Sequence, residues 1–223
     1  SQSQNNFMLS VTHELKTPLT TIQLALQTLS SRKLNEEQKQ NLIEKAISEN
    51  DRLKILIDNI IHASRIENKG FRPDKQKLDL KEMLEKVVNK SNKRHEKNLV
   101  QLDCNTSVHV FADIFMIETS VINIIENAIK YADSKEILVN VRINNHRCDI
   151  SITDAGPGIK ESEQRYIFDK FYRVGNEETR LKKGSGLGLY ISKQFIQLHK
   201  GELKYKKNNP CGSIFTISLP YER

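Results

Sequence analysis

Apolar side chains recur at helical spacing through the first 68 residues. Steps of three and four place one stripe on Met8, Val11, Leu15, Leu19, Ile22, Leu26 and Leu29. After a polar break at residues 30–34, a second stripe alternates four and three, as a heptad seam does: Leu42, Ala46, Glu49, Leu53, Leu56, Ile60 and Ala63. Asn35 and Gln38 have the spacing of a reciprocal helix cap at its start. The pattern predicts two helices joined as an antiparallel hairpin.

A single hairpin with two such stripes cannot bury both of them. We therefore expect two copies of residues 1–68 to pair in a four-helix bundle, which makes this segment a dimerisation element. Residues 69–75 contain Gly70 and Pro73 and are expected to form a linker.

The pattern changes after this linker, because short strand-like segments now lie between amphipathic helices. Helices are expected at residues 79–95, 113–131 and 187–199, with Asp79 and Asp113 as helix caps. Strands are expected at residues 99–104, 137–143, 148–153, 202–206 and 213–219. Strands that adjoin at hairpins, with helices gathered between them, favour an α+β sandwich over repeated βαβ units.

Composition and charge narrow the classes of function. The 223 residues carry a formal net charge of +7, yet residues 1–70 hold nine Lys and Arg against eight Asp and Glu. The excess is concentrated in short stretches such as residues 170–183, which suits a small anionic ligand better than a nucleic-acid track. No run of 18 apolar residues occurs. Three widely spaced cysteines, Cys104, Cys148 and Cys211, indicate unpaired thiols of a reducing compartment.

A histidine beside a carboxylate lies on the first predicted helix. His13 falls between the stripe residues Val11 and Leu15, so it is expected to face solvent, with Thr17 one turn further on the same face. Glu14 is the adjacent carboxylate, and Pro18 removes the amide that would bond the carbonyl of Glu14. Neutral imidazole next to a base is a plausible nucleophile. An isolated pair of this kind is also compatible with an ordinary polar surface.

A polar face follows on the helix predicted at residues 113–131. Asn123 and Asn127 are one turn apart, and Lys130 lies three residues beyond. Two amide oxygens in this arrangement can share a hard cation or its waters, while Lys130 can meet a phosphate. An exposed polar face without a ligand fits the same spacing.

Two glycine clusters follow, at residues 154–159 (Asp-Ala-Gly-Pro-Gly-Ile) and 184–189 (Gly-Ser-Gly-Leu-Gly-Leu). The second opens a helix, where free amides and the positive end of the dipole favour a phosphate. Neither is a P-loop or a Rossmann fingerprint. Between them lie the aromatic segment 167–174, which includes Arg173, and the polar segment 175–183; together they fit an anchored flap over a polyphosphate. As a lone feature, this pattern is more often an ordinary surface loop.

The order of the five motifs is more specific than any one of them. His-Glu-x-x-Thr-Pro, Asn-x-x-x-Asn-Ala-x-Lys-Tyr, Asp-x-Gly-x-Gly-Ile, Phe-x-x-Phe-Tyr-Arg and Gly-x-Gly-Leu-Gly-Leu occur between Phe7 and Pro220. This series resembles the H, N, G1, F and G2 boxes of bacterial sensor histidine kinases. The resemblance implies a dimerisation and phosphotransfer hairpin at residues 1–68, a linker at 69–75, and a Bergerat-type ATP-binding sandwich at 76–223.

The resemblance also implies a role for each matched position. His13 would take the γ-phosphoryl group of ATP, with Glu14 orienting and deprotonating it, and Arg173 would stabilise charge on the transferring group. Mg²⁺ would be held by Asn127, with Asn123. Asp154 would bind the adenine amino group and Lys130 and Tyr131 the phosphates. The remaining ATP-binding positions would be Gly156, Gly158, Ile159, Gly184, Ser185, Gly186, Leu187, Gly188 and Leu189.

By the same resemblance, the partners would be a second copy of the chain and the aspartate of a response regulator. The regulator is expected to dock on the face that carries His13, Thr17, Thr20, Leu24 and Thr28. Thr17 would support a phosphatase activity toward it. The fragment would lie on the cytoplasmic side of a bacterial plasma membrane, with the sensor and membrane anchor upstream.

Two other classes of function stay open at this point. A free-standing ATPase or protein serine kinase of the same superfamily is one, although related ATPases carry a water-activating Glu where this chain has Asn123. A degenerate member that acts only as a dimeric scaffold is the other, and the intact motifs argue against it.

Overall fold

The computed structural model describes residues 2–67, 71–95, 98–132, 135–174 and 186–221. The chain divides into two compact units, Ser1–Asn68 and Lys69–Arg223. Each unit is described by itself below.

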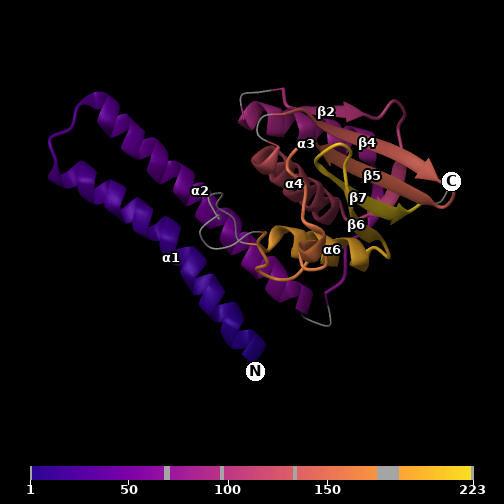
Figure 1. Ribbon diagram of the computed structural model, residues 1–223, viewed down its shortest axis with the longest axis horizontal. Helices are drawn as coiled ribbons and strands as arrows, with labels where there is room; N and C mark the ends of the chain where they lie inside the picture. Colours follow the sequence, from indigo (N-terminus) through magenta and orange to yellow (C-terminus); the bar gives the residue numbers. More distant parts are fainter. Residues whose placement is uncertain (1, 68–70, 96–97, 133–134, 175–185, 222–223) are drawn as a thin grey trace. The chain divides into compact units, whose positions relative to one another are not determined.

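The first unit is a helical hairpin (Figure 1), as the sequence predicts. It consists of α1, Gln2–Ser31, and α2, Glu36–Glu67. The reciprocal cap of α2 is present, because the Gln38 amide donates to Asn35 Oδ1 at 2.8 Å and the Asn35 amide donates to Gln38 Oε1 at 3.1 Å. This cap satisfies donors that the helix itself leaves unpaired and starts α2 at the expected place.

Fewer of the described side chains of α1 are buried than its predicted apolar stripe contains. Val11, Pro18 and Ala25, seven residues apart, are buried on α1. Leu19 and Leu26 of the predicted stripe are instead 57% and 56% exposed. One neighbouring helix covers a line of side chains rather than a whole stripe, which agrees with the expectation that a single hairpin cannot bury both stripes. On α2 the predicted seam holds, with Glu49, Leu56 and Ala63 buried.

The second unit contains a five-stranded sheet in the order β2-β4-β5-β7-β6 and a two-stranded sheet, β1-β3. Among the strands of the described residues, β2 and β4 pair in parallel and the other pairs are antiparallel. The strands are β1 Gln76–Asp79, β2 Val100–Asp103, β3 His109–Ala112, β4 Ile137–Asn144, β5 Arg147–Asp154, β6 Glu202–Lys207 and β7 Ser213–Pro220. The helices are α3 Leu80–Arg94, α4 Ile114–Tyr131, α5 Glu161–Gln164 and α6 Gly188–Leu198.

The helix caps that the sequence predicts in this unit are confirmed. The Asp79 carboxylate accepts hydrogen bonds from the amides of Lys81 and Glu82, at the start of α3. Asp113 accepts from the Met116 amide, at the start of α4, at 3.2 Å. Each carboxylate satisfies amides of the first helical turn and lies at the positive end of its helix.

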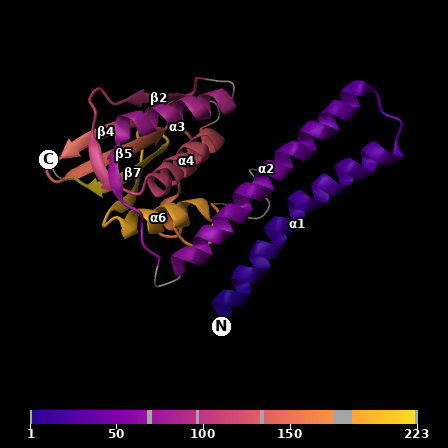
Figure 2. The same ribbon diagram turned by 180° about the vertical axis from the view of Figure 1, so that it is seen from behind.

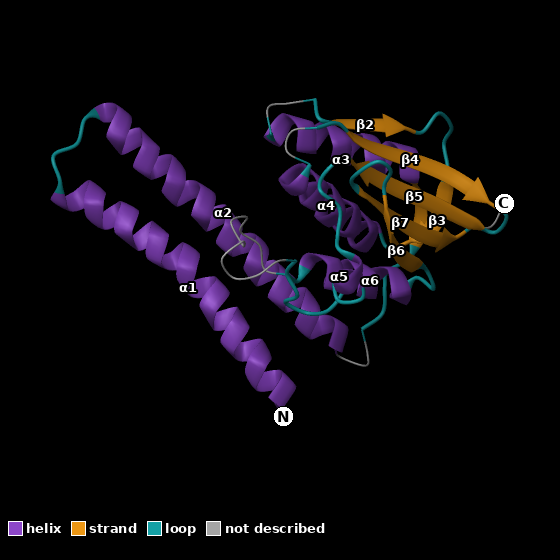
Figure 3. Cartoon of the chain, in the orientation of Figure 1, coloured by secondary structure: helices purple, strands orange, loops and turns teal. Residues whose placement is uncertain are grey.

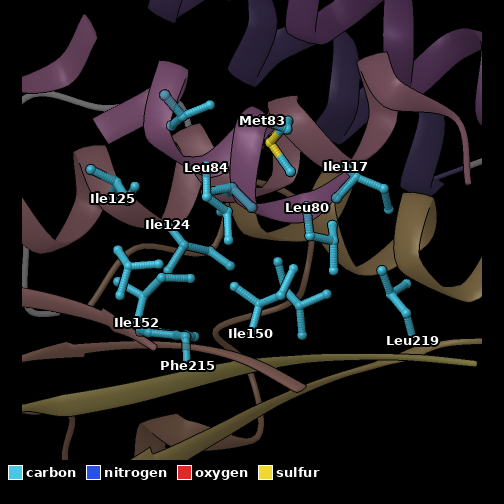
Figure 4. Packing of buried hydrophobic residues seen from close by; sticks show 14 of the residues in the cluster. Leu80, Met83, Leu84, Ile117, Ile124, Ile125, Ile150, Ile152, Phe215 and Leu219 are labelled. Carbon is cyan, nitrogen blue, oxygen red and sulfur yellow. The ribbon is translucent and has the colours of Figure 1, made fainter. Parts of the chain in front are cut away.

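The helices α3, α4 and α6 cover one face of the larger sheet, as Figures 2 and 3 show from opposite sides. Alternate residues of β5 and β7 are buried, so each strand turns one face to these helices. The core lies between the two layers (Figure 4) and includes Leu80, Leu84, Ile117, Ile124, Ile150 and Ile152. The architecture confirms the predicted α+β sandwich.

Within the described residues, no helix combines the length and the hydropathy that a membrane crossing requires.

Candidate functional site

Asp154 ends β5 with a buried carboxylate, only 5% exposed. Its Oδ1 accepts the Gly156 amide at 2.8 Å and the Ser213 amide at 3.2 Å. Burial raises the pKa of Asp154, and the hydrogen bonds from Gly156 and Ser213 oppose that rise. Both backbone donors use the same oxygen, and the Ser213 side chain is a further hydrogen-bond partner of the carboxylate. A carboxylate has about four lone-pair sites, so it can accept a further hydrogen bond from a ligand.

The loop before β7 closes around the first glycine cluster, and sequence reasoning assigned it no role. The Asn208 side chain donates to the Asp154 carbonyl at 3.1 Å. Gly212, at φ +114°, packs against that same carbonyl, where a side chain would collide with it. The amide of Ile159 donates to the hydroxyl of Tyr205 at 3.0 Å, which ties the cluster to β6. In the sequence, the Pro-Cys-Gly segment before β7 is the local pattern that could have indicated this loop.

Asn123 joins α4 to the start of α6. Its side-chain Nδ2 donates to the Gly188 carbonyl at 3.2 Å and to the Ser192 hydroxyl at 3.3 Å. These two bonds use both amide protons and leave Oδ1 as the acceptor of the group. Asn127 follows one turn along α4 and is half-buried.

At the C-terminal end of α4 two cations approach Tyr131. Lys130 Nζ lies 4.9 Å from the centre of the Tyr131 ring. Burial raises the pKa of Tyr131, while the positive charge of Arg173 acts to lower it. The structure thus brings together three predicted phosphate-site residues, one of them from a segment 42 residues away in sequence.

The second glycine cluster meets the aromatic segment at the N-terminus of α6. The Phe171 amide donates to the Gly186 carbonyl at 3.0 Å. Gly186, at φ +68°, lies so close to the Phe171 backbone that a Cβ would come within 2.7 Å of it. Leu187 is buried, and Gly188 and Leu189 begin α6. The predicted residues Gly184 and Ser185 lie outside the described residues.

Glu126 precedes Asn127 but contacts a different helix. Its carboxylate lies 3.1 Å from His95 Nε2, at the end of α3, and 4.0 Å from a guanidinium nitrogen of Arg94. Glu126 is therefore held beside α3. The position four residues before Asn127, where related ATPases place their water-activating carboxylate, is occupied by the amide of Asn123.

On the hairpin, the His13 backbone belongs to α1, while its side chain lies outside the described part of the structure. Glu14 is half-buried and its Oε2 lies 3.6 Å from a guanidinium nitrogen of Arg52 on α2. Thr17 is exposed, and its carbonyl accepts the Thr21 hydroxyl at 3.1 Å. Pro18 lies inside α1, which continues through it to Ser31.

The donor set suits a magnesium–nucleotide site better than a transition-metal site. Within the described ranges, no three His, Cys, Asp or Glu side chains converge as a metal cluster. Amide oxygens one turn apart on α4, near Lys130 and Arg173, are hard ligands that bind a cation also coordinated by phosphates. The residues present therefore fit Mg²⁺ carried by a nucleotide.

Two family descriptions match the chain. Residues 112–223 match the histidine kinase-, DNA gyrase B- and HSP90-like ATPase family, and residues 3–69 match the His Kinase A (phospho-acceptor) domain. Sensor protein RprX of Bacteroides fragilis is 33% identical over 228 residues, covering 99% of this chain and 44% of that protein. The sensor-like histidine kinase SenX3 of Mycolicibacterium smegmatis is 27% identical, covering 98% and 58%. The chain thus spans about half the length of these relatives.

Solved structures agree with these matches. The histidine kinase AdeS of Acinetobacter baumannii superposes with a TM-score of 0.73 at 28% identity, over 95% of this chain and 98% of that one. The histidine kinase ThkA, solved in complex with response regulator protein TrrA, shares the fold with a TM-score of 0.74 at 21% identity, over 97% and 61%. The chain belongs to the sensor histidine kinase family, of which it comprises the phospho-acceptor and ATPase-like parts.

Proposed function

We propose that this chain is the catalytic part of a two-component sensor histidine kinase. It transfers the γ-phosphoryl group of ATP to His13 and then passes the group to an aspartate of a response regulator. The observation that carries the proposal is the buried Asp154 carboxylate, which the amides of Gly156 and Ser213 orient through one oxygen. A carboxylate oriented in this way suits the exocyclic amino group of adenine.

The phosphates would lie between α4 and the N-terminus of α6. Lys130 and Arg173 supply positive charge near Tyr131, and the first amides of α6 supply hydrogen-bond donors. Asn127, together with Asn123 Oδ1, would hold Mg²⁺, which supplies charge neutralisation at the β- and γ-phosphates.

In the first chemical step, an imidazole nitrogen of His13 attacks the γ-phosphorus, the bond to the bridging oxygen breaks, and ADP leaves. Glu14 takes the proton that the imidazole must lose, and Arg173 stabilises the charge that develops on the transferring group. A water-activating carboxylate would compete with this step. Glu126 is engaged by His95 instead, which favours transfer to histidine over hydrolysis.

In the second step the phosphoryl group moves from His13 to a carboxylate of the regulator. The P–N bond breaks, a P–O bond forms, and the imidazole takes back a proton. ThkA is known in complex with the regulator TrrA, and the complex supports a regulator as the partner class for this chain. Thr17 would position a water for the opposed phosphatase reaction, in which the acyl-phosphate P–O bond of the phosphoaspartate breaks, a P–O bond to water forms, and inorganic phosphate leaves.

The second copy of the chain would pack on the exposed apolar residues of the hairpin. Leu19, Leu26, Ile47, Ile57 and Ile61 are each more than 40% exposed in the single chain. The relatives are sensor proteins about twice the length of this chain. We accordingly infer a cytoplasmic catalytic fragment of a membrane-anchored sensor.

A phosphotransfer assay tests the proposal. The chain is incubated with Mg²⁺ and γ-labelled ATP, and a receiver domain is added once label has accumulated. Label should appear on the chain and then move to the receiver, and both steps should fail in His13→Gln. Release of labelled inorganic phosphate with no labelled chain would indicate an ATPase, and ATP binding without either product would indicate a scaffold.

A further inference from the structure

A charged side chain occupies a seam position of α2. Glu49 is the third residue of the seam and is 7% exposed, although the other residues of the seam, such as Leu56 and Ala63, are apolar. A carboxylate buried between two helices costs free energy unless it is paired. The burial of Glu49 therefore calls for a cationic partner and a reason for keeping the pair.

That partner is Arg52, one turn further along α2. Arg52 Nη1 lies 3.3 Å from Glu49 Oε2, and Arg52 Nη2 lies 3.6 Å from Glu14 Oε2 on α1. The side chains of Arg52 and Glu14 are 25% and 19% exposed, so water screens this pair less than a surface pair. One guanidinium thus bridges two carboxylates from the two helices of the hairpin.

We propose that Arg52 is a positioning residue for the phosphorylation of His13, acting through Glu14 and anchored by Glu49. The proposal rests on the proposed function, in which Glu14 is the base for His13. Glu14 has a flexible side chain, and an ion pair on the side of α2 restricts the rotamers that it samples. The planar fork of arginine can hold both carboxylates at once, whereas lysine offers a single point charge.

The proton balance of the step is unchanged by this arrangement. The imidazole of His13 gives one proton to the Glu14 carboxylate as the N–P bond forms and ADP departs. Arg52 keeps its charge throughout, since a guanidinium does not deprotonate in proteins. Glu49 remains its partner while Glu14 is neutral. The bridge therefore keeps Arg52 in place when the Glu14 charge is lost.

The test is a double-mutant cycle on autophosphorylation under saturating Mg-ATP. Arg52→Gln should lower the maximal rate by about tenfold, with the KM for ATP unchanged because the substitution lies in the hairpin. In a Glu14→Gln background the same substitution should change the rate less than twofold, since the group on which Arg52 acts is already gone. Arg52→Lys should recover part of the wild-type rate. Lys54→Gln is the matched control, because it removes one exposed positive charge from the same helix and should leave the rate unchanged.

Two results would overturn the proposal. One is an Arg52→Gln chain that keeps the wild-type rate, and the other is an equal loss in the wild-type and Glu14→Gln backgrounds, which would mean a role independent of Glu14. Thermal unfolding and dimer content are measured for each variant. If Arg52→Gln does not fold, Arg52→Lys or Glu49→Gln takes its place in the cycle. Each is then measured alone and in combination with Glu14→Gln. Absence of any label on the wild-type chain would instead contradict the proposed function itself.

Discussion

At the level of single residues, the fold orients the Asp154 carboxylate that we propose as the adenine contact. The first oxygen accepts the backbone amides of Gly156 and Ser213, which fix the carboxylate at the end of β5. The second is the group that we assign to adenine. The two functions can be separated by a substitution that keeps one oxygen and replaces the other.

Asp154→Asn is such a substitution. Asparagine can still accept hydrogen bonds from the amides of Gly156 and Ser213, but its NH₂ group replaces the oxygen assigned to adenine. The asparagine NH₂ group and the adenine amino group, both donors, would then face each other. We expect ATP affinity to fall by about 10²-fold, the scale of losing a charge-assisted hydrogen bond worth roughly 1.5–3 kcal/mol. Isothermal titration with ATP measures the effect. Asp149→Asn, five residues earlier on β5, is the matched control and should keep the affinity. Unchanged binding by Asp154→Asn would contradict the site.

A substitution at Thr17 should separate the phosphatase activity toward the regulator from autophosphorylation. Thr17 cannot act as a base, but its exposed hydroxyl, one turn from His13, can hold a water near a docked phosphoaspartate. Thr17→Ala should lower dephosphorylation of the regulator by roughly tenfold or more and spare autophosphorylation. Ser30→Ala, which removes an exposed hydroxyl of α1 outside the expected regulator face, is the control. Loss of both activities in Thr17→Ala would show that its role is structural.

Residues of the candidate site differ in how far the sequence could predict them. Asp154 and Asn127 lie in short motifs whose spacing carries their chemistry. Ser213 and Asn208 hold Asp154 from 59 and 54 residues away, so no local pattern reveals them. Arg52 was equally hidden, because its importance depends on the pairing of α1 with α2 rather than on its neighbours in sequence.

At the level of elements, His199 connects the end of α6 to the start of α4. Its Nδ1 donates to the Phe195 carbonyl at 2.7 Å, and its Nε2 accepts the amide of Asp113 at 2.9 Å. The ring is 3% exposed and must be neutral to accept at Nε2. Burial lowers the pKa of His199, with a further lowering from Lys75, while Phe195 and Asp113 act to raise it.

Stability should therefore depend on pH through His199. A histidine whose pKa is depressed in the folded state contributes stability above its ordinary pKa, and that contribution is lost as the pH falls toward the folded value. Thermal unfolding of the chain should show a drop from about pH 7.5 to about pH 5 that is smaller in His199→Gln. His146→Gln, an exposed histidine between β4 and β5, serves as the control. An equal drop in His199→Gln and wild type would exclude this contribution.

Two equally exposed leucines of α1 should have different partners. Leu19 and Leu24 are each 57% exposed, and five residues place them about 140° apart around the helix. Leu24 shares its face with Thr17 and Thr20, where we expect the regulator. Leu24→Glu should slow transfer to the regulator by about tenfold and spare autophosphorylation. Leu19→Glu should instead weaken the dimer in analytical ultracentrifugation. Equal loss of both reactions in Leu24→Glu would indicate a folding defect.

Sequence periodicity predicted the long elements and missed the short ones. The helices α1 to α4 and α6, and the five strands of the larger sheet, lie within a few residues of their predicted positions. β1 and β3 were not predicted, since each is four residues long, β1 has one buried residue, Leu78, and β3 exposes Phe111 by 70%. A strand this short is defined by its partner rather than by its own pattern.

At the level of the whole molecule, the proposed phosphoryl acceptor and the proposed nucleotide site lie in different units. His13 belongs to the hairpin unit, and Asp154, Asn127 and Lys130 belong to the second unit. Such a division suits a reaction that has to be switched, because approach of one unit to the other can control it. It also predicts that nucleotide-site variants leave the hairpin dimer intact.

The bond formed at His13 gives the clearest measurement. The chain is labelled with γ-labelled ATP and Mg²⁺, and portions are then treated with acid and with alkali. A phosphoramidate on His13 predicts label that is lost in acid and retained in alkali, and no label in His13→Gln. Label that survives acid and is lost in alkali, or that persists in His13→Gln, would place the phosphoryl group on another side chain and contradict a histidine kinase.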